Sequence, residues 1–184
     1  MEVSQVIFNQ NSANPKALHA FYAEVIGLDP NPEMGEGALM AAGTPFIVDG
    51  HSELSGPTKE PPRTMVNFAV DDLVAETQRL EAAGVEFLVR RGPPAPEEIA
   101  FATFIDPDGG YGQIFQMDGA PSGTRMFAVS RHTGDPDRMR ALCRDVVGLS
   151  EGAPELGSPF IVGSAFIYIS PHTEISGKAS EPAR

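Results

Sequence analysis

Hydrophobic and polar residues alternate from Val3 to Gln10, which predicts a β-strand near the start of the chain. Asn14 followed by Pro15 is typical of a helix start, because an Asn side chain caps free backbone N–H groups and proline needs no N–H there. Gly27 is of the residue type that most often ends a helix. Shorter apolar segments predict strands near residues 30–35, 38–42 and 45–49. The first 63 residues therefore predict a strand, a helix and three further strands.

Residues 64–118 follow the same order of elements. Asp71 and Asp72 precede an amphipathic segment and are suited to cap the first turn of a helix. The sequence Asp-Pro-Asp-Gly-Gly at residues 106–110 is typical of a tight turn between two strands. The predicted elements are a strand at 64–70, a helix at 73–83, and strands at 85–90, 99–105 and 111–117, with a proline-rich loop at 91–98.

An internal repeat extends this pattern to the rest of the chain. A shift of 121 residues lays residues 1–63 over residues 122–184 without a gap. The segment His51–Gly56 then matches His172–Gly177, and Pro15 falls on Pro136. Repeats of a fixed period indicate repeated structural units. The sequence therefore predicts an α+β fold built from three βαβββ modules.

Four segments resemble the vicinal oxygen chelate superfamily, whose members include glyoxalase I, extradiol dioxygenases, fosfomycin-modifying enzymes and the bleomycin resistance proteins. They are Phe21–Leu28, Asn67–Leu73, Leu80–Val85 and Asp106–Gly109. The resemblance implies that the first two modules pair into one curled mixed sheet that forms a glyoxalase-like cup. Residues 1–118, with modules 1–63 and 64–118, would then be a complete glyoxalase/bleomycin resistance-like domain. Residues 119–184 would be a third half-domain that repeats residues 1–63.

In that superfamily the catalytic members hold a divalent metal through a His on the first strand of each module and a Glu on the last strand. The matching positions here are Ile7, Met65 and Gln113. Divalent cations need carboxylate, imidazole or thiolate donors, which none of the three supplies. We therefore expect no metal, no cofactor and no catalytic residue in the cup.

Strand alternation predicts instead which side chains line the cup as a ligand-binding site. They are Gln5, Ile7, Asn9, Met65, Asn67, Tyr111, Gln113 and Phe115. The opposite face carries apolar residues such as Val66 and Phe68, as expected if it packs on the helices. Apolar walls with a few neutral polar groups are typical of small-molecule pockets. An alternative for Asn9 and Asn67 is that their amides satisfy backbone groups at strand ends.

These residues favour a metal-free small-molecule-binding protein of the glyoxalase/bleomycin resistance type. Its ligand would be cationic or aromatic, and sequestering an antibiotic is one such role. The alternative is a metal-dependent lyase or dioxygenase of the same superfamily with atypical ligands. A third hypothesis is a regulatory or partner-binding module whose cup is filled by its own side chains.

Composition and charge limit the classes of molecule that this protein is expected to bind. The chain has 184 residues with 25 acidic and 13 basic side chains, a net charge of −12 that argues against binding to nucleic acid or to an anionic membrane. Residues 1–63 and 64–121 carry net charges of −5 and −7, whereas residues 122–184 are neutral. The acidic excess would steer cationic ligands to the predicted cup, or alternatively serve only to keep the protein in solution. The one cysteine, Cys143, forms no internal disulfide, and no apolar segment is long enough to span a membrane, so we expect a cytoplasmic protein.

The third module has no predicted partner within the chain. Its apolar runs Pro159–Val162 and Phe166–Ile169 would be left exposed, which soluble proteins usually avoid. We therefore predict a homodimer through the third module, with the absence of a fourth module as the alternative.

Overall fold

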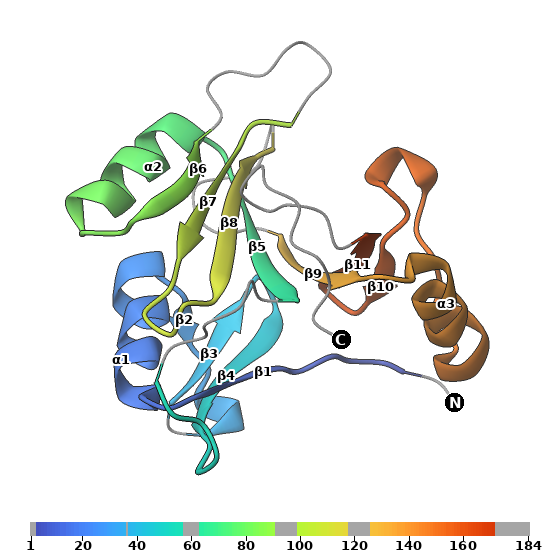
Figure 1. Ribbon diagram of the computed structural model, residues 1–184, viewed down its shortest axis with the longest axis horizontal. Helices are drawn as coiled ribbons and strands as arrows, with labels where there is room; N and C mark the ends of the chain where they lie inside the picture. Colours follow the sequence, from blue (N-terminus) through green and yellow to red (C-terminus); the bar gives the residue numbers. More distant parts are fainter. Residues whose placement is uncertain (1–2, 36, 57–62, 91–98, 118–125, 172–184) are drawn as a thin grey trace.

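The computed structural model describes residues 3–35, 37–56, 63–90, 99–117 and 126–171. Its strands form one four-stranded and one seven-stranded sheet, with short helices packed against them (Figure 1). This mixed α+β architecture confirms the predicted fold class. No helix in the described part of the chain is long and apolar enough to cross a membrane.

The four-stranded sheet is built from the first module and has the order β1-β4-β3-β2. Its strands are β1 (Phe8–Ser12), β2 (Asp29–Pro30), β3 (Ala38–Ala41) and β4 (Thr44–Gly50). β1 is parallel to β4, and their pairing begins at Phe8 opposite Phe46. The strand predicted to start at Val3 therefore starts five residues later, because no strand in the described chain pairs with residues 3–7.

Two helices of the same design occupy equivalent places in the first and third modules. The first is α1 (Pro15–Ala20), continued by the π-helical segment η1 (Phe21–Ile26); the other is α3 (Pro136–Ala141), continued by η3 (Leu142–Val147). The predicted cap is confirmed, because the Asn14 side chain accepts a hydrogen bond from the Ala17 N–H. Gly27 and Gly148 end the two segments with φ of 87° and 82°, a left-handed conformation that glycine adopts without strain.

The seven-stranded sheet joins the second and third modules in the order β10-β11-β9-β5-β8-β7-β6. The second module contributes β5 (Thr64–Val70), α2 (Leu73–Ala82), β6 (Phe87–Arg90), β7 (Phe101–Ile105) and β8 (Tyr111–Gln116). The third contributes β9 (Phe127–Thr133), β10 (Phe160–Val162) and β11 (Ala165–Pro171). β5 lies at the centre, parallel to β8 and antiparallel to β9 (Figure 1).

This pairing corrects the expectation that the first and second modules form the curled sheet. The second module pairs instead with the third, through β5 and β9, with Val66 opposite Val129 at the middle of the ladder. The premise of the predicted dimer, a third module without a partner in the chain, is therefore wrong. Phe160 and Val162 are almost fully buried within one chain. The dimer itself stays a prediction, as does the division into domains at residue 118.

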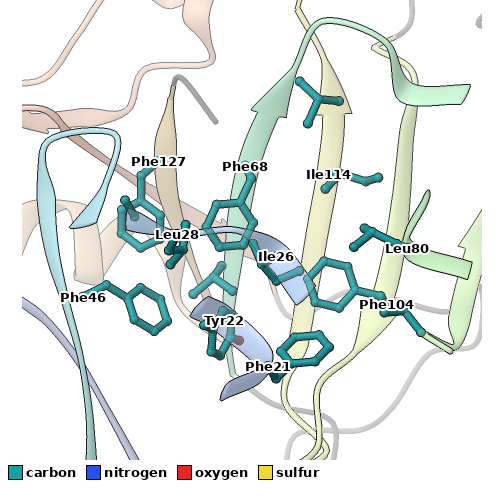
Figure 2. Close-up of a cluster of buried hydrophobic side chains, with 14 of the residues drawn as sticks. Phe21, Tyr22, Ile26, Leu28, Phe46, Phe68, Leu80, Phe104, Ile114 and Phe127 are labelled. Carbon is teal, nitrogen blue, oxygen red and sulfur yellow. The ribbon is translucent and has the colours of Figure 1, made fainter. Parts of the chain in front are cut away.

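The hydrophobic core explains how the first module packs against the seven-stranded sheet. It lies between α1 and η1, the four-stranded sheet and one face of the seven-stranded sheet (Figure 2). Tyr22 is completely buried and its ring lies 4.6 Å from that of Phe46 and 6.5 Å from that of Phe68. Phe127 contacts both of these phenylalanines, with ring centroids 5.9 and 5.7 Å away. The first module is thus held by its helix and apolar sheet face, which leaves the opposite face of the seven-stranded sheet free.

Candidate functional site

The main cavity lies on that opposite face and has a volume of about 620 Å³. Strands of the second module form one side, and β9, β11 and the short helix η4 (Pro154–Leu156) of the third module form the other. Its apolar lining is Ile99, Phe101, Phe115, Met117, Met126, Ala128, Leu156 and Phe166. Its polar lining is Asn67, Gln113, Ser130, Glu155, Tyr168 and Ser170. The cavity has the size and the predominantly apolar character of a small-molecule pocket.

Strand alternation places these side chains. In β5 the residues Val66 and Phe68 are buried in the core, so Asn67 between them faces the cavity. The same alternation in β8 puts Ile114 in the core and Gln113 in the cavity lining. The prediction of which face of these strands packs inward is therefore confirmed.

Asn67 also joins the two halves of the sheet. Its Nδ2 donates to the carbonyl oxygens of Met65 and Ala128, at 3.1 and 3.2 Å, and lies 3.0 Å from Ser130 Oγ. Ala128 and Ser130 belong to β9, so a single side chain on β5 bonds across the seam between the second and third modules. The alternative that this amide satisfies backbone groups is therefore correct for its nitrogen, while the residue also lines the cavity.

The eight predicted ligand-binding residues are divided by the structure. Asn67, Gln113 and Phe115 line the main cavity together. Met65 is buried on the same strand as Asn67 and is not part of the lining. Asn9 and Tyr111 line a second, smaller cavity, and Gln5 and Ile7 lie on exposed chain before β1. The expectation that all eight share one cup is wrong because it assumed the first module to be the partner of the second. Their roles in binding stay predictions.

The residues that sequence reasoning missed come mainly from the third module: Met126, Ala128, Ser130, Glu155, Leu156, Phe166, Tyr168 and Ser170. The internal repeat could have identified three of these residues. Shifted by 121 positions, the predicted residues Gln5, Ile7 and Asn9 fall on Met126, Ala128 and Ser130. The prediction thus names the correct positions of the module's first strand, but places them in the first module, whereas the cavity is lined by the same positions of the third.

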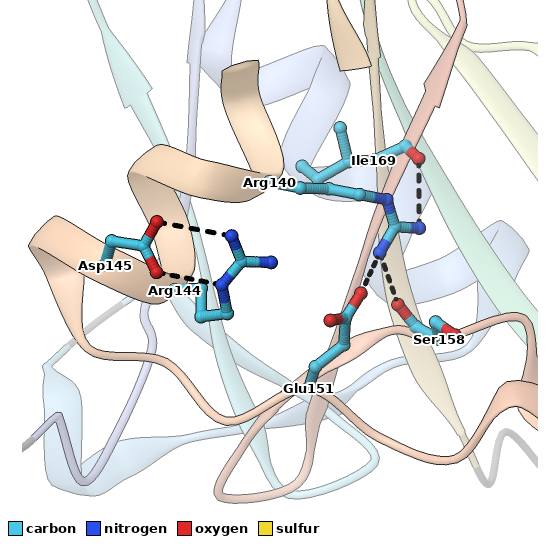
Figure 3. A network of polar contacts seen from close by, with 6 residues as sticks. All are labelled: Arg140, Arg144, Asp145, Glu151, Ser158 and Ile169. Carbon is cyan, nitrogen blue, oxygen red and sulfur yellow. Dashed lines mark hydrogen bonds and ion pairs between the residues drawn. The ribbon is translucent and has the colours of Figure 1, made fainter. Parts of the chain in front are cut away.

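A polar network fixes the wall that carries η4 (Figure 3). Arg140 on α3 forms an ion pair with Glu151 and donates to the Ser158 carbonyl oxygen at 2.9 Å. It also donates to the Ile169 carbonyl oxygen at 3.4 Å, on β11. One guanidinium group thus contacts both ends of residues 151–158, the segment that places Glu155 and Leu156 at the cavity.

The second cavity, of about 320 Å³, lies between β1 and the turn that connects β7 to β8. At its base Asp106 is only 4% exposed and its carboxylate accepts four hydrogen bonds. The donors are Gln10 Nε2 at 2.9 Å, the Tyr22 hydroxyl at 3.0 Å, and the N–H groups of Asp108 and Gly110 at 2.9 and 2.7 Å. Asp106 therefore connects the first module to the turn of the second, a structural task that its place in the sequence motif did not reveal.

The same contact makes Tyr22 resistant to ionisation. Burial, followed by the charge and hydrogen bond of Asp106, raises the pKa of the Tyr22 phenol well above its usual value of 10.0. In the unfolded chain the phenol loses its proton near pH 10, whereas in the folded protein it keeps the proton to higher pH. The stabilisation is therefore complete below about pH 10 and decreases as the pH rises further.

We accordingly expect the wild-type protein to lose more unfolding free energy between pH 9 and pH 11 than the Tyr22→Phe variant. Urea denaturation followed by circular dichroism at the two pH values measures the difference. An equal loss in both proteins would show that the Tyr22 phenol does not titrate differently in the folded and unfolded states.

The metal centre implied by the superfamily does not fit the side chains of the main cavity. Asn67 and Gln113 supply neutral amides, Ser130 and Tyr168 supply hydroxyl groups, and Glu155 is the one carboxylate in the described lining. No three His, Cys, Asp or Glu side chains gather at any point of the described residues in a way that would hold an ion. Zinc and iron sites are built from imidazole, thiolate and carboxylate donors, so this lining is unsuited to them.

Solved structures with a similar fold include a glyoxalase, a proposed dioxygenase and a fosfomycin resistance protein. Glyoxalase I from Zea mays is 13% identical with a TM-score of 0.68, and the match covers 91% of this chain and 67% of that one. A proposed dioxygenase from Bacillus subtilis is 15% identical with a TM-score of 0.60; the match covers 92% of this chain and 64%, just under two thirds, of the B. subtilis protein. The fosfomycin resistance protein FosX from Listeria monocytogenes is 17% identical with a TM-score of 0.50, over 65% of this chain and 97% of its own. At these identities the likeness shows a shared fold.

A search of curated proteins found no match. A family model described as a glyoxalase-like domain matches residues 5–115, which is more than half of the chain. Together with the structural neighbours, this match confirms the predicted membership of the vicinal oxygen chelate superfamily. The chain belongs to the glyoxalase-like domain family.

Proposed function

We propose that this protein binds a small, largely apolar organic molecule in the main cavity, without a metal ion. The observation that carries the proposal is the lining of the cavity. Among the described residues the lining combines four aromatic rings, those of Phe101, Phe115, Phe166 and Tyr168, with two neutral amides and one carboxylate. Apolar walls supply the binding free energy and a few fixed polar groups orient the ligand.

The position of the cavity supports the same proposal. It lies where the second and third modules meet, between halves of one sheet that are held in register by five pairs of residues and by the Asn67 amide. A cavity with walls on regular strands is preorganised, so little ordering of the protein opposes binding. Sequestration of a toxic compound fits this arrangement, and fosfomycin resistance is the role that FosX carries in its name.

The proposal predicts that Nile red, a neutral apolar dye, binds this cavity and gains fluorescence. Phe166→Glu places a charge in the apolar wall and is expected to weaken dye binding at least tenfold, because burial of an aromatic ring contributes about 1.5–3 kcal/mol. Val146→Glu is the matched control, since Val146 lies on η3 of the same module, is 72% exposed and does not line the cavity. Circular dichroism confirms that both variants are folded. Absence of dye binding to the wild type, or equal binding by both variants, would contradict the proposal.

The enzyme hypothesis, a metal-dependent lyase or dioxygenase with atypical ligands, makes a different prediction. A thermal-shift series with Mn²⁺, Fe²⁺, Ni²⁺ and Zn²⁺ would then show stabilisation by one ion, abolished by a chelator, because any ligand of the folded state raises its stability. We expect no such shift. An increase of several degrees with any of these ions would favour the enzyme over the binding protein.

A further inference from the structure

Two amide side chains lie side by side at the base of the main cavity. Asn67 on β5 and Gln113 on β8 are direct partners in the parallel ladder, and both line the cavity. Neighbouring strands lie about 4.8 Å apart, so ligand atoms that reach one amide are close to the other. What these two groups offer a ligand depends on which end of each amide is already bonded to the protein.

The amide nitrogen of Asn67 is hydrogen-bonded within the protein. Its Nδ2 donates to two backbone carbonyl oxygens, those of Met65 and Ala128. A carbonyl oxygen can only accept, so these contacts fix the amide with its nitrogen toward β9. Asn67 is only 5% exposed, which holds the group in that orientation.

One N–H group of Gln113 is also bonded within the sheet. Its Nε2 donates to Thr103 Oγ1 at 3.3 Å, and Thr103 is completely buried on β7, the next strand of the sheet. Within the described residues no protein group donates to Asn67 Oδ1 or to Gln113 Oε1. Asn67 therefore uses both of its N–H groups inside the sheet and Gln113 uses one, and both amide oxygens remain as acceptors for the cavity.

The rest of the lining reinforces this polarity. Glu155 adds a carboxylate, the hydroxyl groups of Ser130, Tyr168 and Ser170 can accept as well as donate, and no Lys, Arg or His stands among the described residues of the lining. An acceptor that stays unpaired when a ligand covers it loses its hydrogen bonds to water, so a ligand without donors is disfavoured there. A carboxylate ligand at this position would place its oxygens against the two amide oxygens, and the charge of Glu155 would repel it.

We infer that the ligand is an aromatic or compact apolar molecule that presents N–H groups, as in a carboxamide, urea or amidinium, to the paired oxygens of Asn67 and Gln113. This inference rests on the proposed function, because it assigns the ligand class of the same cavity. The N–H groups occupy both acceptors, while the apolar body of the ligand packs on the aromatic wall formed by Phe101, Phe115 and Phe166. The site selects against carboxylates and against ketones of the same shape.

The test uses displacement of Nile red by four single-ring probes of nearly equal size. Benzamide and acetophenone differ by an NH₂ group in place of a methyl group, and benzamidine and benzoate form the charged pair. We expect benzamide to displace the dye at about a tenfold lower concentration than acetophenone, and benzamidine to bind more tightly than benzoate. Equal displacement by benzamide and acetophenone would overturn the inference, even if benzamidine remained preferred, since that result would reflect the charge of Glu155 alone.

Variants of Gln113 test whether the preference for benzamide over acetophenone depends on the amide oxygens. Gln113→Leu is expected to retain dye binding and to reduce the preference for benzamide over acetophenone at least threefold, whereas Gln113→Glu restores an acceptor and strengthens benzamidine binding. Gln116→Leu, an exposed change on the same strand outside the cavity, is the control and should leave all four affinities unchanged. An unaltered preference in Gln113→Leu would overturn the inference while the proposed function stands. If the wild-type protein binds no dye, the proposed function itself fails.

Discussion

Asp106→Ala is expected to lower the free energy of unfolding by about 3 kcal/mol or more, because it removes the acceptor of four hydrogen bonds at once. The Tyr22 hydroxyl, which is completely buried, loses its acceptor in the core. The N–H groups of Asp108 and Gly110 lose the oxygen that shapes the turn between β7 and β8. Each buried donor left without a partner costs about 1–3 kcal/mol, and the adjacent cavity admits water to only part of the set.

Urea denaturation of the wild type and three variants measures this effect. Asp108→Ala changes the same turn at a half-exposed side chain whose carboxylate forms no hydrogen bond within the described chain, so a loss below about 1 kcal/mol is expected. Tyr22→Phe removes one donor and leaves Asp106 with three others, so its effect should lie between the two. If Asp106→Ala proved no more harmful than Asp108→Ala, Asp106 would have no special role in joining the modules.

Gly112→Ala is expected to destabilise the protein by about 3 kcal/mol, through a clash with a side chain that cannot move away. A methyl group at this position would lie 2.1 Å from Cζ of Phe104, well inside van der Waals contact. Gly112 and Phe104 are direct partners in the antiparallel pair of β8 and β7, so the ring covers the glycine. The Phe104 ring is completely buried and is held by Phe21 and Phe87, with centroids 5.9 and 6.3 Å away. Overpacking of this kind typically costs 1–3 kcal/mol and at times more.

The matched control is Gly134→Ala, because a methyl group there meets no atom within 4 Å. A double variant tests the cause: in Phe104→Leu the smaller side chain leaves room for a methyl group on residue 112. Gly112→Ala should therefore cost less in the Phe104→Leu background than in the wild type, which thermal denaturation of the four proteins of this cycle measures. Identical costs in both backgrounds would place the clash elsewhere.

Local structure was predictable from the sequence because its signals are local. Asn14 and Asp72 cap helices through contacts three residues away, at 3.3 and 2.9 Å, and such spacing is visible in the chain itself. The inward and outward faces of β5 followed from alternation alone. The pattern predicts the start of β1 too early. A strand needs a pairing strand as well as alternation, and residues 3–7 have no pairing strand in the described structure.

The candidate site was only partly predictable. Asn67, Gln113 and Phe115 were identified correctly as sharing a face, since all three lie in one module and their register follows from one parallel pairing. The other side of the cavity depends on which module lies beside β5. The sequence offered two equivalent candidates, β1 and β9, because these strands come from two copies of the same repeat.

The amino-acid sequence by itself determined the module, its helix caps, the inward faces of β5 and β8, and the lack of His and Glu at Ile7, Met65 and Gln113, all of which depend on residue type and short spacing. Only the tertiary structure decided that β9, and not β1, pairs with β5. The physical reason lies in the core: Phe21 and Tyr22 of the first module are buried between the two sheets, so this module packs by its helix face. The edge of β5 then remains available to β9, whose Phe127 completes the same aromatic cluster. Competition between two similar strands for one neighbour is settled by the total surface that the whole fold buries, which no local pattern records.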